Sequence, residues 1–125
     1  MNNHVQQSVL KTKSFLFAIR IVRLCQHVQS VRKEYVLTKQ LLRSGTSVGA
    51  MIREAEYAES KSDFAHKMAI ARKEINETLY WLDLLAATDY LTLKEAESVH
   101  ADALELLKML TSTIKTVKIN LVTSS

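Results

Sequence analysis

The sequence predicts an all-α protein, and three features of its composition lead to that prediction. The chain has 125 residues, of which 47% are hydrophobic, so it is too apolar to be disordered throughout. It contains two glycines and no proline, which argues against the many tight turns of a β-sandwich or barrel. Its single cysteine cannot form an internal disulfide or a multi-thiolate metal site, as is typical of a reducing compartment. We therefore expect one helical domain over residues 1–125, located in the cytoplasm.

The first helix is predicted at about residues 8–31. Its apolar residues recur at spacings of three and four and form one stripe: Phe17, Ile21, Leu24, Val28 and Val31. A second apolar stripe lies beside the first: Phe15, Ile19, Val22 and Cys25. One stripe is enough to join a bundle, so the second predicts an apolar contact outside the monomer. The stretch 15–22 is interrupted by Arg20 and is far shorter than the ~20 apolar residues that span a bilayer, so no membrane is expected as a partner.

The second helix is predicted at about residues 36–58 and contains both glycines, Gly45 and Gly49. Its core residues are expected to be Leu37, Leu41, Ser44, Val48, Ile52 and Ala55. Glycine inside a helix costs ~1 kcal/mol relative to alanine, so two of them need a reason. The spacing of the glycines puts them on one face, where a neighbouring backbone could approach closely. A kink or a local functional need is the alternative.

The third and fourth helices are predicted at about residues 62–87 and 93–121. Ser60-x-x-Asp63 is an N-cap pattern and Thr92-x-x-Glu95 is a capping box. The expected core residues of the third helix are Phe64, Met68, Ala71, Ile75, Leu79, Leu82 and Leu85 or Ala86. Those of the fourth are Leu93, Ala96, His100, Ala103, Leu107, Leu110, Ile114, Val117 and Leu121. Four long helices with short connections predict an antiparallel up-down-up-down four-helix bundle.

No motif of catalysis, metal binding or cofactor binding is present in the sequence. A Gly-rich phosphate loop, His-Glu-x-x-His and Gly-x-Ser-x-Gly are all missing, as are the Glu-x-x-His pairs of di-iron bundles. We therefore expect a protein that is not an enzyme and that needs no cofactor or metal.

Charge is distributed unevenly along the chain, although the formal net charge is only +4. Residues 1–53 carry nine Lys and Arg against one acid, whereas residues 54–105 carry twelve acids against five Lys and Arg. A basic face on two adjacent helices can neutralise phosphates, which makes six residues candidate nucleic-acid contacts: Lys13, Arg20, Arg23, Lys39, Arg43 and Arg53. The alternative is that these cations pair with the acidic third helix, within the bundle or across subunits. Aromatic residues are not interleaved with arginines, so base-specific recognition is not indicated.

An ordered set of motifs adds a family resemblance. The chain contains Gln40-Leu41-Leu42-Arg43-Ser44, Ser47-Val48, Ile52-x-Glu54, Ser60-x-x-Asp63-Phe64, Ile70-Ala71 and Glu77. This order and spacing, over about residues 10–121, resembles the four-helix-bundle proteins encoded in 23S rRNA intervening sequences. The segment Lys73-Glu74-x-x-Glu77-Thr78-Leu79-Tyr80-Trp81-Leu82 is similar to the branch common in Bacteroidetes-like bacteria. The chain departs from the family at Met51, Arg53 and Ala55, where Asn, Ala and Gly are usual, and at Lys73-Glu74, where Gly-Ser is common.

The resemblance implies a cytoplasmic four-helix bundle similar to relatives that assemble as ring-like homopentamers. One such relative, the accessory protein of diversity-generating retroelements, binds nucleic acid and the reverse transcriptase through a basic surface. Our leading hypothesis is therefore a non-enzymatic homo-oligomer that binds RNA or DNA backbone through the six cations. One alternative is an interaction module that docks a nucleic-acid-handling partner such as a reverse transcriptase. Another is a structural oligomer whose cations are used in subunit contacts.

Overall fold

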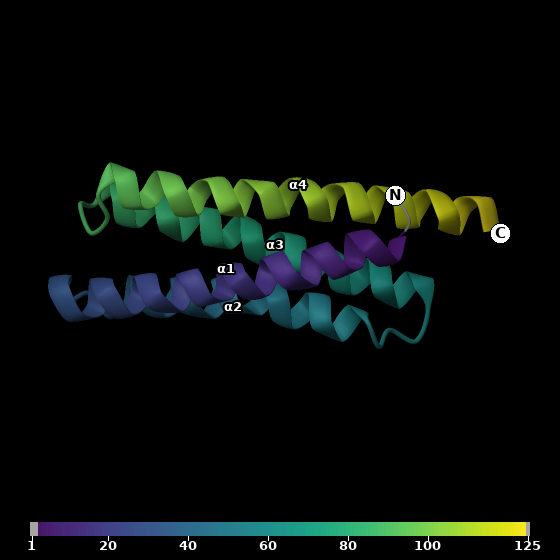
Figure 1. The fold of residues 1–125 in the computed structure, drawn as a ribbon, viewed down its shortest axis with the longest axis horizontal. Coiled ribbons are helices and arrows are strands. Elements are labelled where there is room, and N and C mark those ends of the chain that lie inside the picture. The colour runs from purple at the N-terminus through teal and green to yellow at the C-terminus, as the bar shows by residue number, and fades with distance from the viewer. Residues whose placement is uncertain (1–2, 125) are drawn as a thin grey trace.

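The computed structural model describes residues 3–124 and contains four α-helices within that part of the chain. They are α1 (Asn3–Arg32), α2 (Leu37–Ala55), α3 (Lys61–Ala87) and α4 (Leu93–Ser124). Successive helices run in opposite directions, and the two chain termini lie at the same end of the molecule (Figure 1). Each helix packs on the next one along the chain, and α1 also contacts α4, in the least extensive of the four contacts. The predicted all-α, up-down-up-down four-helix bundle is confirmed.

The helix boundaries differ from the predicted ones mainly at three ends. α1 begins at Asn3 rather than near residue 8, and α4 continues to Ser124 rather than ending near residue 121. α2 ends at Ala55, three residues before the predicted end at residue 58. The backbone N–H groups of Glu56, Tyr57 and Ala58 donate to carbonyls three residues earlier, at 3.2, 3.0 and 3.2 Å. These shorter-range bonds tighten the last turn and end the α-helix there.

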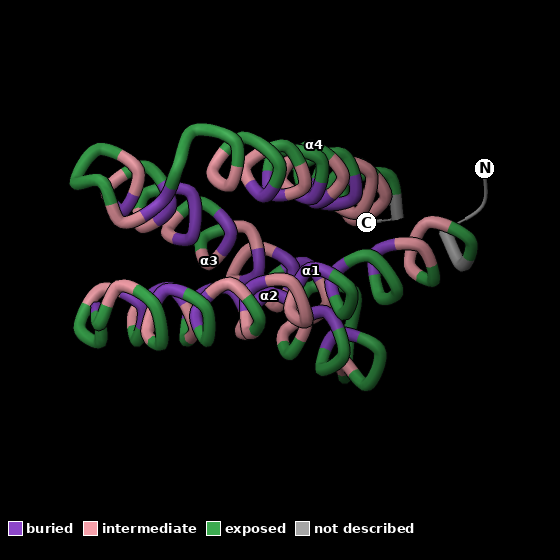
Figure 2. The backbone as a smooth tube through the Cα atoms, turned by 60° about the vertical axis from the view of Figure 1, so that its left-hand side comes forward, coloured by how far each residue is buried: buried purple, intermediate pink, exposed green. Residues whose placement is uncertain are grey.

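The buried residues recur along the inner sides of all four helices and form one apolar core (Figure 2). The predicted core faces of α2 and α3 are buried except at their first residues, Leu37 and Phe64, which pack against the core from its edge. The prediction for α1 was wrong at Val31, which is 61% exposed. Cys25, placed in the second stripe and expected to be a small buried apolar residue, is buried as predicted.

The predicted core face of α4 was also partly wrong. Leu93 is 77% exposed, whereas Val99 and Leu106 are buried although they lie outside the predicted stripe. Leu106 lines a groove together with Phe17 of α1, and Val99 lines another with Leu24 of α1. The apolar face of α4 is therefore wider than one stripe, because it meets α1 as well as α3.

The two glycines of α2 lie where α1 approaches most closely. A Cβ built on Gly45 would lie 2.8 Å from Cγ2 and 2.9 Å from Cγ1 of Ile21, closer than real Cβ contacts allow. A Cβ on Gly49 would lie 3.4 Å from the backbone oxygen of Ser14. α2 is a continuous helix through both positions. Of the two explanations open at the sequence level, the structure supports close helix packing at Gly45, whereas an alanine at position 49 would meet Ser14 at an ordinary contact distance.

Side-chain hydrogen bonds cap the N-termini of α2, α3 and α4, and the sequence predicted the caps of α3 and α4. The Ser60 hydroxyl accepts from the Asp63 N–H at 3.0 Å, and Thr92 and Glu95 exchange the two bonds of a capping box at 2.8 and 3.2 Å. The missed cap is Glu34, which is buried at the start of α2. Its carboxylate accepts from the backbone N–H groups of three successive residues, 36, 37 and 38, at 3.1, 2.8 and 2.8 Å.

The α1–α2 connection also encloses the single cysteine. The Cys25 thiol is buried and donates to the backbone oxygen of Thr38 at 3.4 Å. Burial, together with the nearby negative charge of Glu34, raises the pKa of this thiol to about 12. At neutral pH it is therefore a protonated thiol and packs as a small apolar residue, as the sequence predicted. Across residues 3–124, no helix combines the length and apolar character needed to span a membrane.

Candidate nucleic-acid interface

The six predicted cations do not form one patch. Lys13, Arg20 and Arg23 lie on the side of α1 that borders α4, where all three line one groove with Asp102 and Glu105 of α4. The other three, Lys39, Arg43 and Arg53, are exposed on α2. The structure thus divides the set among the α1–α4 boundary, the exposed side of α2 with Lys39 and Arg43, and the groove between α1 and α2 that Arg53 lines.

Lys13 and Arg20 are already paired with acids of α4. The Lys13 ammonium pairs with the Glu105 carboxylate, and the Arg20 guanidinium pairs with the Asp102 carboxylate. Nη2 of Arg20 also donates to the Ser98 hydroxyl at 2.7 Å. These side chains are 40–50% exposed, so the pairs lie at the surface and each stabilises the fold by no more than about 1 kcal/mol. The alternative interpretation expected partners on the third helix, but the partners are on the fourth.

A third link between α1 and α4 is centred on Glu95, and the sequence did not single it out. Arg32, in the last turn of α1, donates to the Glu95 carboxylate at 3.0 Å and to the backbone oxygen of Tyr90 at 2.8 Å. Nε2 of His27 lies 3.4 Å from the same carboxylate. The N–H of Thr92 and, despite partial burial, the Arg32 guanidinium hold the pKa of Glu95 below its ordinary value. The capping box identified Glu95 from the sequence, but its pairing with α1 depends on the tertiary fold.

The remaining four predicted cations are exposed and unpaired. Arg23, Lys39, Arg43 and Arg53 form no side-chain hydrogen bond or ion pair with any residue in the described range 3–124. Lys39 and Arg43 are one turn apart on α2, so their side chains point the same way. These four residues are the free cations of the predicted interface.

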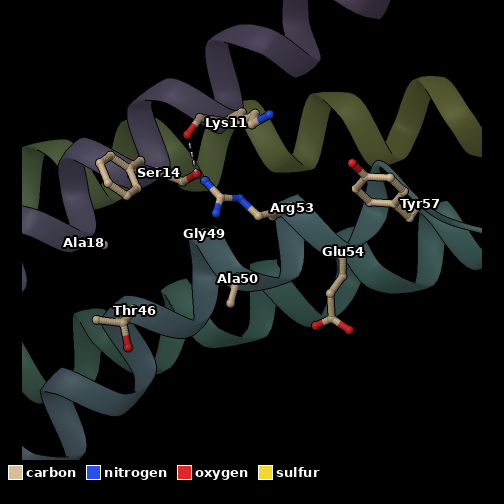
Figure 3. A pocket seen from close by; sticks show the side chains of 10 residues that line it. Lys11, Ser14, Ala18, Thr46, Gly49, Ala50, Arg53, Glu54 and Tyr57 are labelled. Carbon is tan, nitrogen blue, oxygen red and sulfur yellow. Dashed lines mark hydrogen bonds between the residues drawn. The ribbon is translucent and has the colours of Figure 1, made fainter.

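Arg53 lies in a shallow groove of about 460 Å³ between α1 and α2. Figure 3 shows its guanidinium extending from α2 toward Ser14 of α1. Small residues form part of the lining: Ser14, Ala18, Gly49 and Ala50. Two exposed aromatic residues, Phe15 and Tyr57, border the same groove. The helix packing thus brings aromatic residues beside a free arginine, which the linear sequence did not show because they lie on different helices or turns.

The charges around this groove are balanced. Lys11 pairs with Glu56 at 3.1 Å, and Glu54, next to Arg53, lies 3.7 Å from the Lys67 ammonium of α3. The groove therefore offers an apolar lining with one free cation rather than a strongly basic channel. Within the described part of the chain, no cluster of three His, Cys, Asp or Glu side chains is arranged to hold a metal ion.

Comparison with known proteins identifies relatives of the whole bundle. The chain is similar to a protein of unknown function from the S23 ribosomal protein family of Bacteroides thetaiotaomicron, whose crystal structure is known. The two are 52% identical with a TM-score of 0.87, over 88% of this chain and 98% of that one. No curated protein matches the chain. Residues 6–112 match the family described as 23S rRNA-intervening sequence protein. The family resemblance is thereby confirmed: this chain belongs to the 23S rRNA-intervening sequence protein family.

Proposed function

We propose that this protein is a non-enzymatic, homo-oligomeric bundle that binds the phosphate backbone of RNA or DNA without strong sequence specificity, in the cytoplasm. The observation that supports binding is the group of four exposed and unpaired cations, Arg23, Lys39, Arg43 and Arg53. A free cation can release a counterion from the nucleic acid when it meets a phosphate. A paired cation, such as Arg20, must first give up its carboxylate.

Assembly of identical chains would strengthen this binding. Each copy contributes only a few free cations, so a single copy binds weakly, whereas a ring of copies repeats the same cations on one particle and gains avidity. Phe15, which belongs to the second apolar stripe predicted for a subunit contact, is 56% exposed, and so is its neighbour Leu16, which the prediction did not include. By resemblance to the ring-forming relatives, we expect a pentamer.

The test of binding is a salt titration with a structured RNA hairpin and a DNA duplex as probes. Replacing Lys39, Arg43 and Arg53 together with glutamine should lower the slope of log affinity against log salt by about one per cation. The matched control removes three exposed lysines of α4: Lys108, Lys115 and Lys118. It changes the net charge equally and should leave most of the slope in place. Equal losses in the two variants, or affinity that does not depend on salt, would contradict the proposal.

A second candidate function is docking of a nucleic-acid-handling protein such as a reverse transcriptase. The groove between α1 and α2 favours it, because exposed Phe15 and Tyr57 beside free Arg53 are the residue types enriched at protein interfaces. Replacing both aromatic residues with serine should abolish capture of the partner and leave the salt slope for RNA unchanged. If the protein captures nucleic acid but no partner protein from an untreated lysate, and captures neither from a nuclease-treated lysate, this function is wrong. If the protein assembles but binds neither nucleic acid nor a partner protein, the remaining hypothesis is a structural oligomer.

A further inference from the structure

Three buried polar atoms on α3 have no hydrogen-bond partner among the described residues. They are Oε2 of Glu74, Oε2 of Glu77 and Nε1 of Trp81. The three residues are spaced by three and four, so they form one stripe along the helix. A buried polar atom without a partner costs about 1–3 kcal/mol, and more when the group is charged. This stripe is therefore incomplete in the isolated chain.

The polar groups next to the stripe are already matched within the bundle. The Thr78 hydroxyl, between Glu77 and Trp81 in sequence, donates to the Glu74 backbone oxygen at 2.8 Å and lies 2.9 Å from the Ser44 hydroxyl of α2. The contact between α2 and α3 thus satisfies its own polar groups and does not supply donors to the two carboxylates. Oε2 of each glutamate thus has no donor among the described residues.

The stripe has a direction along α3. Its first part is acidic, with Glu74 and Glu77, and its last part is aromatic. There Trp81 meets the ring of Tyr80 edge-on, with 5.0 Å between the ring centroids, and Tyr80 is 58% exposed. A complementary surface needs a cation opposite the acids and apolar side chains opposite the aromatic rings.

The edge of α1 that lines the groove with α4 has these groups in the opposite order. Leu16, Ile19 and Arg23 are also spaced by three and four. Leu16 is exposed, Ile19 is half-buried, and Arg23 is exposed and unpaired. Four residues separate Ile19 from Arg23, as four separate Glu77 from Trp81, and both separations are about 6 Å along a helix. The two stripes therefore match when the helices lie antiparallel.

We infer that α3 of one copy packs antiparallel on α1 of a second copy, so that the second copy's Arg23 donates to the carboxylates of Glu74 and Glu77. An arginine suits this position because its planar guanidinium presents several N–H donors that match carboxylate geometry. Leu16 and Ile19 of the second copy then cover the rings of Tyr80 and Trp81, so the contact supplies a donor to the two carboxylates but no acceptor to Nε1 of Trp81. This inference rests on the proposed assembly of identical chains, and α1 and α3 are the helices that form its subunit contact.

This contact uses two different faces of each chain. Such a heterologous contact repeats from copy to copy and closes into a ring when the rotation between neighbours allows it. It also gives an occupant to the exposed apolar side of α1, which would otherwise stay in water. Arg43 is the competing donor within the same chain, because it neighbours Ser44 at the α2–α3 contact, but it forms no ion pair in the structure.

The experiment is a charge exchange read by light scattering during size-exclusion chromatography. Arg23→Glu and the double variant Glu74→Lys/Glu77→Lys should each raise the dissociation constant of the assembly by at least about tenfold. An equimolar mixture of the two variants should regain assembly that neither variant shows alone, because both mixed α1–α3 contacts then join opposite charges. The matched controls are Glu97→Lys and Lys118→Glu, which change exposed charges on α4 and should leave the mass unchanged. Circular dichroism verifies that each variant is folded.

The outcomes separate this inference from the proposals on which it rests. If the unmodified protein is monomeric at every concentration, both the assembly and this contact are wrong. If it assembles and neither charge variant changes its mass, only this contact is wrong. If Glu74→Lys/Glu77→Lys and Arg43→Gln lower the melting temperature by similar amounts and leave the mass of the assembly unchanged, the contact between copies is wrong. The two glutamates then pair with Arg43 of their own chain. Because this contact uses Arg23, the cations that stay open to nucleic acid in the assembly are Lys39, Arg43 and Arg53 of α2, and binding is read separately through them.

Discussion

The carboxylate of Glu34 does at the start of α2 what a serine or threonine hydroxyl does at the starts of α3 and α4. Burial alone would raise the pKa of Glu34, but the N–H groups of Leu37, Thr38 and Val36 outweigh burial and hold this pKa below its ordinary value. The same short connection places Lys33 at a φ of 55°, in the left-handed region that usually favours glycine. Because both glycines lie inside α2, the connections between helices contain no glycine, and side-chain caps such as Glu34 satisfy the backbone N–H groups there.

Glu34→Gln should make the stability of the protein less dependent on acid. The depressed pKa in the folded state means that the carboxylate stabilises the fold above the pKa of the unfolded chain, near ~4.3. That contribution is lost as the pH falls through the lower pKa of the folded state. The free energy of unfolding, measured with urea at pH 7 and at steps down to about pH 3, should therefore differ between the two proteins at pH 7 and converge in acid. A constant difference across this range would contradict the assignment.

The two glycines offer a matched pair of substitutions. Gly45→Ala gains ~1 kcal/mol of helix propensity but drives its methyl group into Ile21, a stiff and fully buried side chain, at a cost of about 1–3 kcal/mol. Gly49→Ala meets Ser14 at an ordinary contact distance. We expect Gly45→Ala to lower the free energy of unfolding and Gly49→Ala to leave it unchanged or raise it by up to ~1 kcal/mol. Equal effects in urea titrations would show that α1 does not approach Gly45 this closely.

At the scale of helices, α1 has two different neighbours. Against α2 it packs backbone to side chain, with Ile21 on Gly45. Against α4 the contact is less extensive and is bordered by ion pairs. Their strength should follow their exposure: the Arg32 and Glu95 side chains are 26% and 28% exposed, whereas those of Arg20 and Asp102 are 40% and 46% exposed. Water screens the second pair more strongly.

Arg32→Ala should therefore destabilise the protein more than Arg20→Ala. Removing Arg32 takes its side-chain donor from the Tyr90 carbonyl and one donor from the Glu95 carboxylate, which still accepts from the Thr92 N–H, and this loss should cost about 1–2 kcal/mol. Removing Arg20 should cost no more than about 1 kcal/mol, and that cost should shrink in 1 M salt. Thermal unfolding at low and high salt measures both. A larger, salt-independent loss for Arg20→Ala would mean that the α1–α4 boundary is buried more deeply than its exposure indicates.

At the scale of the whole molecule, acids and phosphates compete for the same cations. Asp102 and Glu105 neutralise Arg20 and Lys13, so only part of the basic half of the chain is open to a ligand. The charge count along the sequence could not show this, because the acids lie on the last helix and the cations on the first. A nucleic acid that binds Lys13 or Arg20 has to displace these two carboxylates, whereas Arg23 on the same helix is free.

Asp102→Asn with Glu105→Gln should consequently strengthen binding to nucleic acid. Two freed cations should steepen the slope of log affinity against log salt by up to about two, with the largest gain at low salt. Fluorescence anisotropy with a labelled RNA hairpin at several salt concentrations measures the change. Glu97→Gln with Asp89→Asn alters the net charge equally at exposed acids that pair with no cation in the described chain. If the control variant gains as much affinity, the change comes from net charge and not from the release of Arg20 and Lys13.

How much of the fold could be predicted depended on the pattern of each helix. α2 has one apolar face, so its core residues and the close packing at Gly45 followed from helical spacing. α1 has apolar residues on several sides, and the spacing alone could not decide that Cys25 is buried while Val31 is exposed. For α4, the stripe chosen from the spacing omitted Val99 and Leu106, because the contribution of α1 to its surroundings is a tertiary property.

The candidate site was predictable as a set of cations but not as a surface. Helical spacing placed Lys39 and Arg43 together, and both are exposed as a binding face requires. Spacing could not reveal that Arg20 meets Asp102, since acids occur on both α3 and α4 and only the bundle decides which of them faces α1. The aromatic residues beside Arg53 were missed for the same reason, because Phe15 reaches it from another helix.

The order of contacts around the bundle has a consequence for how the chain folds. Three of the four helix contacts join neighbours in sequence, and only the least extensive one, between α1 and α4, joins the two ends. Local contacts of this kind allow refolding within about microseconds to milliseconds. The chain has no proline, so no prolyl isomerisation can add a phase of tens of seconds. The three helical hairpins should form first, and the joining of α1 to α4 should be the last step of folding and the first contact to open.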